Sequence, residues 1–253
     1  MPATVGLMLY TIRDLCEHDL PGALAVVKRA GFDHVELASR HGRSPLEWSK
    51  LLADHDLRPV GAHVGLGDLE QKLEDVLDFA ETLSIERVTV PWTPARTREE
   101  TDELAKRLET VARVVAGAGV KLLYHNHDFE LKPFADEGPG PRTMLDRLAR
   151  VDGLRLEIDT AWVWFAGADV AGVLETHADK VELLHIKDFA HDEPPPHFKP
   201  VGEGRVPLEA ALRTAAVKNA AALIVEQDEL HGQDPLENLT ASRTNLQKML
   251  EEI

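Results

Sequence analysis

The sequence predicts a (β/α)8 barrel, an α/β fold that residues 1–253 form as a single domain. Short apolar runs alternate with amphipathic stretches, which is typical of alternating strands and helices. The eight runs are residues 5–10, 34–38, 59–64, 87–92, 121–126, 154–159, 181–187 and 221–226. Their starts lie 25 to 40 residues apart, close to the length of one strand with its crossover helix. Eight such units favour a closed barrel over the main alternative, an open parallel sheet.

Helix signals occupy the segments between the runs. Ser44 to Glu47 and Thr97 to Glu100 each read as a capping box at a helix start. Gly31 and Gly119 stand where C-terminal caps belong. We therefore expect helices to begin after Ser44 and Thr97 and to end before these glycines.

Two further segments show the apolar period of a surface helix. In residues 69–83, apolar side chains recur three and four positions apart, with acidic and basic side chains on the other face. Residues 235–253 repeat the pattern. We expect one helix over each segment, the second closing the outer ring. Residues 128–142 and 189–207 lack a period and are expected to be long loops, either functional or mobile.

Charge and cysteine content exclude several classes of function. The chain has 28 Lys and Arg against 44 Asp and Glu, a net charge of 28 − 44 = −16, so we expect no nucleic-acid partner. The single cysteine, Cys16, excludes an internal disulfide and a multi-cysteine metal site, and is consistent with the cytoplasm. No apolar run approaches the ~18 residues of a membrane span, so no membrane partner is expected.

Polar side chains follow almost every apolar run. Because barrel enzymes carry their sites at the C-terminal ends of the strands, these residues are candidates for function. Asp159, His185 and Glu226 each follow four or five mostly apolar residues and should lie at one height. Oxygen and nitrogen ligands that converge there suit a divalent metal, although an internal salt bridge is the plain alternative.

The fifth run is ambiguous. His125 and His127 alternate and so share one face of a strand, and Glu130 follows three residues later. Either His125 or Glu130 could complete the metal shell. His127 is then placed to act as a base or to orient a ligand, because an imidazole titrates near neutral pH.

Other side chains are candidates for substrate binding. Lys187 should share a face with His185 and could stabilise an alkoxide or enolate. Lys199 and Arg205 flank the turn 202–204, whose backbone amides could cradle a hydroxyl or phosphate; an ordinary tight turn is equally consistent. The remaining substrate candidates are His63, which a core position would also explain, and Trp162, which adds aromatic surface. Arg13, Glu36 and Trp92 are candidates for the rim only.

These motifs, taken together, resemble the sugar phosphate isomerase/epimerase family of xylose isomerase-like TIM barrels. The resemblance rests on residues 34–37, 62–63, 124–130, 157–162, 185–188, 201–204 and 225–226, in order along nearly the whole chain. It implies one divalent metal, Mn before Co, Mg or Zn, held by a fifth-strand carboxylate with Asp159, His185 and Glu226. Many members carry Glu where this chain has His125. Glu130 is therefore assigned to the metal. His125 is its rival as the fifth-strand ligand and is otherwise assigned to substrate binding.

The resemblance further implies chemistry on a small sugar. A metal would stabilise the enolate that forms when a base removes the proton next to a carbonyl. His127 and Glu226 are the expected bases and Lys187 the electrostatic support, in an isomerase or epimerase acting on a keto-sugar or sugar phosphate. A lyase acting on an inosose or 3-keto-sugar is the alternative, favoured by the histidine-rich fifth strand. A DNA-repair nuclease and a non-catalytic sugar-binding protein are weaker alternatives, and the resemblance leaves room for a homo-oligomer.

Overall fold

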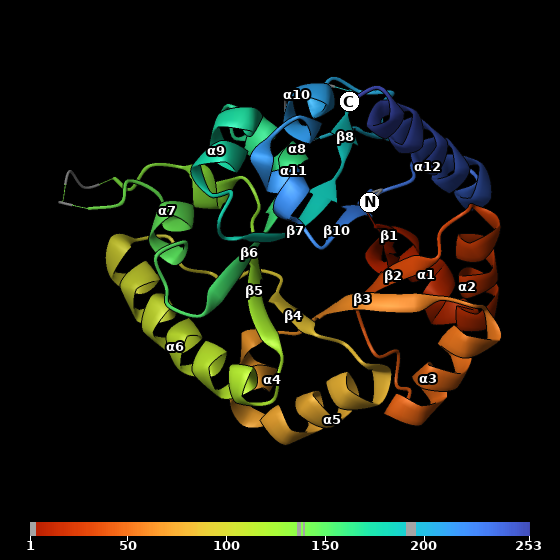
Figure 1. Ribbon diagram of the computed structural model, residues 1–253, viewed down its shortest axis with the longest axis horizontal. Coiled ribbons are helices and arrows are strands. Elements are labelled where there is room, and N and C mark those ends of the chain that lie inside the picture. The colour runs from red at the N-terminus through yellow and green to blue at the C-terminus, as the bar shows by residue number, and fades with distance from the viewer. Residues whose placement is uncertain (1–3, 136–137, 139, 191–195) are drawn as a thin grey trace.

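Eight parallel strands close into a barrel in the computed structural model, which describes residues 4–135, 138, 140–190 and 196–253 (Figure 1). The strands follow the order β1-β10-β7-β6-β5-β4-β3-β2 around the barrel. Their bounds are β1 Val5–Met8, β2 His34–Leu37, β3 Arg58–His63, β4 Arg87–Val90, β5 Lys121–His125, β6 Leu154–Asp159, β7 Val181–Ile186 and β10 Ala222–Val225. Seven of the eight predicted runs contain one of these strands and the run 59–64 overlaps β3, so the predicted (β/α)8 fold is confirmed.

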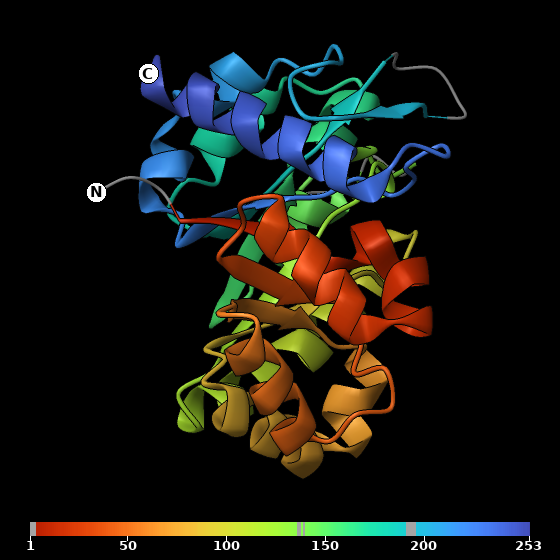
Figure 2. The same cartoon turned by 90° about the vertical axis from the view of Figure 1, so that its right-hand side faces the viewer.

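Helices form a ring around the barrel (Figures 1 and 2). They are α1 Arg13–His18, α2 Leu20–Arg29, α3 Pro45–Asp54, α4 Leu66–Gln71, α5 Leu73–Leu83, α6 Arg98–Gly117, α7 Met144–Leu148, α8 Thr160–Phe165, α9 Val170–Thr176, α10 Leu208–Leu212, α11 Ala215–Asn219 and α12 Pro235–Glu251, with 3-10 turns η1 Leu9–Ile12 and η2 Phe129–Leu131. In the part of the chain that the structure describes, none of them combines the length and apolar character of a membrane span.

The predicted caps are present. Ser44 and Glu47 form both hydrogen bonds of a capping box at the start of α3, and Thr97 and Glu100 do so at the start of α6. The prediction of one helix over residues 69–83 is wrong, because the chain breaks at Lys72 (φ −133°) between α4 and α5. Apolar side chains point inward on both sides of the break, so their period does not reveal it. The break leaves α4 beside the C-terminal end of β3.

Three layers fill the barrel from one end to the other. At the N-terminal end, Glu182 joins Arg87 of β4 and Lys121 of β5. A small apolar cluster follows, formed by Met8, Leu123, Leu183, Ala222 and Ile224. Above it the inward side chains become polar. Because β-strand residues two apart share a face, Leu123 and Leu183 are followed on the same side by histidines, which start the polar layer.

A hairpin stands over the C-terminal end of the barrel. It pairs β8 (Asp188–Phe189) with β9 (Phe198–Lys199) in antiparallel register, and all of it except Asp188 falls in the predicted loop 189–207. Figure 2 shows it on the side to which the barrel strands run. The predicted loop 128–142 contains η2 and a bridge between Pro133 and Thr143 at its far end. Residues 136–137, 139 and 191–195 of these two loops lie outside the described residues.

Candidate functional site

A cavity of 320 Å³ opens at the C-terminal ends of the strands. It is lined by Met8, Tyr10, Ala38, His63, Pro91, Trp92, His125, His127, Lys187, Glu226 and Asp228. We call it the mouth cavity. Its side chains come from seven of the eight strand ends, all but that of β6, so the barrel itself gathers residues that are far apart in the sequence.

Four buried side chains converge next to the mouth cavity, and two of them, His125 and Glu226, line it. His125 ends β5, Asp159 ends β6, His185 lies near the end of β7 and Glu226 follows β10. Their ligand atoms all lie within 4.8 Å of one another. Two imidazoles and two carboxylates form a donor set that suits a first-row divalent ion, and the two negative charges would balance its charge.

His185 connects this group to a deeper carboxylate. Its Nδ1 lies 2.7 Å from Glu226 Oε2, and its Nε2 lies 2.8 Å from Glu36 Oε2 on β2. A neutral imidazole that binds an ion through Nδ1 keeps its proton on Nε2, which then donates to Glu36. Burial, together with the nearby Glu157, raises the pKa of Glu36 to about 7. Glu36 is therefore placed to fix the tautomer and the ring orientation of His185.

Glu157 plays the corresponding part beneath His125. Its Oε2 lies 3.2 Å from His125 Nδ1 and accepts a hydrogen bond from His63 Nε2 at 2.7 Å. His63, His125, Glu157 and His185 form a second group with ligand atoms within 4.8 Å. Because the inner nitrogens of His125 and His185 carry protons when the outer ones bind an ion, this deeper group acts as support for the upper one.

Lys187 supplies a fixed positive charge. Its Nζ lies 2.9 Å from Asp159 Oδ2, 2.8 Å from Glu226 Oε2 and 2.7 Å from Asp228 Oδ1. Burial alone would lower the pKa of Lys187, but Asp159, Asp228 and Glu226 outweigh it and hold that pKa well above its usual value. Lys187 is therefore an ammonium group that shares carboxylate oxygens with the proposed ligands.

Unsatisfied polar atoms concentrate at this end of the barrel. Of nine buried side-chain atoms without a hydrogen-bond partner among the described residues, six lie here. Four of them are Glu36 Oε1, His127 Nδ1, Glu157 Oε1 and Trp162 Nε1. The other two, His125 Nδ1 and Asp159 Oδ2, have only ion-pair neighbours outside hydrogen-bond geometry, Glu157 Oε2 at 3.2 Å and Lys187 Nζ at 2.9 Å. Since a buried polar atom without a partner costs stability, a cluster of them points to a ligand that completes the bonding. The donor set and these atoms fit a divalent cation.

Comparison with known proteins identifies the family. Residues 24–250 match the family model described as the xylose isomerase-like TIM barrel. The chain belongs to this family. The resemblance noted in the sequence is thereby confirmed.

Three relatives of this xylose isomerase-like barrel are each distant from it in sequence. It is 28% identical over 114 residues to an inosose dehydratase of Geobacillus kaustophilus, a match that spans 40% of this chain and 35% of that protein. A sugar phosphate isomerase/epimerase of Parabacteroides distasonis superposes with a TM-score of 0.83 at 18% identity, over 98% of this chain and 94% of that one. The structure of the IolI protein with a bound zinc atom superposes with a TM-score of 0.74 at 14% identity, over 100% of this chain and 99% of that one. At these identities the structural likenesses show the fold alone.

The xylose isomerase-like barrel holds Glu130 apart from the four converging residues. The carboxylate of Glu130 accepts hydrogen bonds from Tyr124 Oη at 3.0 Å and from the backbone N–H of His127 at 2.8 Å. Burial raises the pKa of Glu130 to about 7. Of the two rivals for the fifth-strand position, the structure brings His125 to the group, whereas Glu130 ties η2 to β5 and so supports the backbone of His127.

The prediction that the backbone amides of residues 202–204 bind a hydroxyl or phosphate of the substrate is wrong. The carboxylate of Asp188 already accepts hydrogen bonds from the backbone amides of Gly202, Gly204 and Val206, at 2.9 to 3.0 Å. These donors are therefore satisfied within the protein. Lys199 lies half-buried on β9, while Arg205 is exposed.

Aromatic side chains flank His127. Its ring lies 5.7 Å from the ring of Trp162 and 6.2 Å from that of Phe129, centroid to centroid. Burial, followed by the charge of Lys187, lowers the pKa of His127 to about 4. The imidazole is therefore neutral near pH 7. Trp162 also lies 5.6 Å from Lys187 Nζ, which places it against the wall of the polar group.

The sequence analysis did not assign three carboxylates of the site to it. Glu36, assigned to the rim, is fully buried against His185. Glu157 and Asp228 were not assigned to the site. Each lies two residues from a proposed ligand, Glu157 before Asp159 and Asp228 after Glu226, so the two-residue period of a strand was the signal available for them.

Proposed function

We propose that the protein is a divalent-metal-dependent isomerase or epimerase that acts on a keto-sugar. The observation that carries this proposal is the convergence of four ligand side chains, with buried unsatisfied atoms around them, next to a cavity that His125 and Glu226 line. The sugar chemistry named for its relatives supports the substrate class.

The ion would be held by His125, Asp159, His185 and Glu226, with Mn before Co, Mg or Zn. A divalent ion polarises a carbonyl group and stabilises the negative charge that develops when the neighbouring carbon loses a proton. No thiol belongs to the donor set, so the choice among these metals follows geometry and availability.

The chain's own residues supply the proton transfer. His127 lines the mouth cavity, and its Nδ1 has no hydrogen-bond partner. The neutral imidazole can accept a proton from a sugar carbon and return it to another carbon or another face. Lys187 keeps a positive charge next to the developing negative charge, while Asp159, Glu226 and Asp228 hold its ammonium group in place. Glu226 is the second candidate base.

Proton exchange tests this proposal without knowledge of the natural product. D-fructose and a series of other ketoses are incubated with the Mn-loaded protein in D2O, and deuterium at carbon is followed by NMR. We expect deuterium incorporation only when metal is present, and we expect His127→Gln to abolish it. The control is His18→Gln on the exposed face of α1. Absence of exchange with every ketose, in protein shown to bind metal, would contradict the proposal.

A lyase is the second candidate, because a relative that matches 114 residues of the chain is an inosose dehydratase. Removal of the same proton, followed by loss of a hydroxyl on the next carbon, would give an unsaturated product. Mass spectrometry separates the two reactions, since dehydration lowers the mass of the sugar by one water and isomerisation leaves it unchanged.

A further inference from the structure

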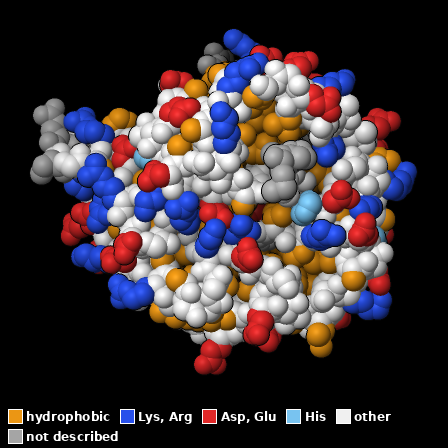
Figure 3. Space-filling model, in the orientation of Figure 1, with side chains coloured by type: hydrophobic (Ala, Val, Ile, Leu, Met, Phe, Trp, Pro, Cys, Tyr) orange, Lys and Arg blue, Asp and Glu red, His pale blue; other side chains and the backbone are white. Residues whose placement is uncertain are grey.

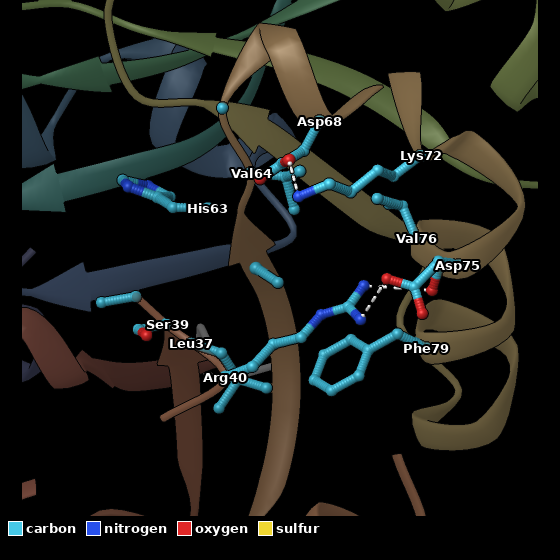
Figure 4. A pocket seen from close by; sticks show the side chains of 13 residues that line it. Leu37, Ser39, Arg40, His63, Val64, Asp68, Lys72, Asp75, Val76 and Phe79 are labelled. Carbon is cyan, nitrogen blue, oxygen red and sulfur yellow. Dashed lines mark hydrogen bonds and ion pairs between the residues drawn. The ribbon is translucent and has the colours of Figure 1, made fainter. Parts of the chain in front are cut away.

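We propose that a second pocket next to the mouth cavity binds an uncharged, hydroxyl-rich group attached to the reacting sugar, such as a second sugar ring. This inference rests on the proposed function and adds the substrate class to it. The pocket has a volume of 360 Å³ and lies between the C-terminal ends of β2 and β3 and the helices α4 and α5 (Figure 4). We call it the side pocket.

The side pocket and the mouth cavity share a wall. His63 and Ala38 line both. Figure 4 shows His63 at one edge of the side pocket, with the charged side chains of α4 and α5 opposite. A ligand that reaches His125 and Lys187 in the mouth cavity can therefore extend past His63 without leaving the protein surface. At 320 and 360 Å³, each cavity is at the small end of the roughly 300–1,000 Å³ range of ligand pockets, so a larger substrate would use both.

Charges in the side pocket cancel in pairs. Arg40 Nη1 lies 2.7 Å from Asp75 Oδ2, and Arg40 Nη2 donates to the backbone oxygen of Asp75 at 3.0 Å. The guanidinium also lies 4.4 Å from the centroid of the Phe79 ring, which fixes its plane. Lys72 Nζ lies 2.9 Å from Asp68 Oδ1. Two cations and two carboxylates leave no net charge, so an anionic group would have to break an existing pair.

These pairs still offer hydrogen bonds to a neutral ligand. An ammonium group has three donors, and the partner of Lys72 uses one of them. Each carboxylate has a second oxygen, and the exposed Ser39 adds a hydroxyl group. Val64 and Val76 supply apolar surface for the C–H face of a ring. Fixed donors and acceptors beside apolar surface are what a polyol requires.

The mouth cavity disfavours phosphate for a related reason. Lys187 is its buried cation, and three carboxylates surround it. The amides of residues 202–206 that could have bound phosphate are held by Asp188. Both cavities therefore favour an unphosphorylated glycoside of the reacting sugar over a sugar phosphate.

Calorimetry of the Mn-loaded protein tests the side pocket. The probes are D-fructose, its glucosides turanose, maltulose and isomaltulose, which carry glucose on different hydroxyls, and fructose 6-phosphate. We expect at least one glucoside to bind about tenfold more tightly than fructose, and fructose 6-phosphate to bind no more tightly than fructose.

Two glycines provide a matched pair of variants. Gly65 lines the side pocket, and a side chain added there meets nothing within 4 Å. Gly67 is equally open but does not line the pocket. We expect Gly65→Trp to remove the gain of the glucoside and to leave fructose binding intact, whereas Gly67→Trp preserves both. Asp75→Asn frees the charge of Arg40 and should strengthen binding of fructose 6-phosphate.

The outcomes separate the side pocket from the proposed function. Fructose binding without any gain for the glucosides, or a gain that survives Gly65→Trp, would overturn the side pocket and leave the proposed function standing. Tighter binding of fructose 6-phosphate to the unaltered protein would overturn the neutral character of its ligand. If none of the sugars binds to metal-loaded protein, the proposed function fails and the side pocket fails with it.

Discussion

The two ends of the barrel both carry buried charge, but they satisfy it differently. At the N-terminal end, Glu182 accepts from Arg87 Nε at 2.8 Å and from Lys121 Nζ at 2.7 Å, and the Lys121 side chain is 49% exposed. Figure 3 looks onto this end and shows charged side chains of both signs near its centre. At the C-terminal end, histidines and carboxylates are buried together, and several of their atoms lack hydrogen-bond partners.

This difference separates structural charge from functional charge. Partly exposed cations can neutralise a carboxylate at little cost, since water solvates their remaining hydrogen bonds. A fully buried cluster with unpaired atoms costs stability, and such a cluster persists where function requires it. The mouth cavity is therefore where substitutions should harm activity, and the N-terminal end is where they should harm stability alone.

Loss of a proposed ligand is expected to have the largest effect. Asp159→Asn removes a charge from the group of four, and we expect turnover to fall by about 10³-fold or more. The melting temperature should stay the same or rise in the absence of added metal, because burial of the Asp159 carboxylate and its repulsion with Glu226 outweigh its attraction to Lys187 and raise its pKa. Calorimetric melting alongside the deuterium exchange assay checks both. Unchanged turnover would remove Asp159 from the chemistry.

Loss of the deeper carboxylate should have an intermediate effect. Glu36→Leu removes the acceptor that holds Nε2 of His185, and we expect metal affinity to fall by about 10- to 100-fold. Glu36→Gln retains an acceptor oxygen and should lose less. Competition with a fluorescent chelator measures both affinities. Equal affinities for Glu36→Leu and the unaltered protein would show that His185 needs no support from Glu36.

Glu182→Gln, at the N-terminal end, should lower the free energy of unfolding by about 1 kcal/mol and leave turnover unchanged. Burial would raise the pKa of Glu182, but hydrogen bonds from Lys121 and Arg87 outweigh it and lower that pKa. A depressed carboxyl pKa stabilises the fold above the unfolded pKa, and this contribution is lost as the pH falls through the folded value. Urea unfolding of Glu182→Gln should therefore show a weaker loss of stability between about pH 5 and about pH 3. If the free energy of unfolding of Glu182→Gln falls with decreasing pH as steeply as that of the unaltered protein, Glu182 does not have this role.

The sequence was sufficient for the fold and for part of the site. The period of eight apolar runs predicts the barrel, and the ends of those runs locate Asp159, His185 and Glu226. The contact of His185 with Glu36 joins residues 149 positions apart, and only closure of the barrel brings them together. The choice between His125 and Glu130 depended on the direction of η2, which no period encodes.

Asp188 shows why the sequence also predicted a substrate site that the structure does not contain. Its neighbours Lys187 and His185 belong to the polar group, yet its own carboxylate binds the backbone of the turn 202–206. A glycine-rich turn next to cations looks the same in the sequence whether its amides face a ligand or a side chain of the protein. The direction of the Asp188 carboxylate, toward the turn, decides between the two.

Metal content tests the central claim most directly. Protein purified without chelator or added metal is measured by elemental analysis for the unaltered chain, His125→Ala and Glu130→Gln. We predict about one divalent ion per chain in the unaltered protein and in Glu130→Gln, and a loss of the ion in His125→Ala. No ion in the unaltered protein, with none taken up on titration, would contradict a metal centre at the mouth cavity, and loss in Glu130→Gln alone would contradict the assignment of His125.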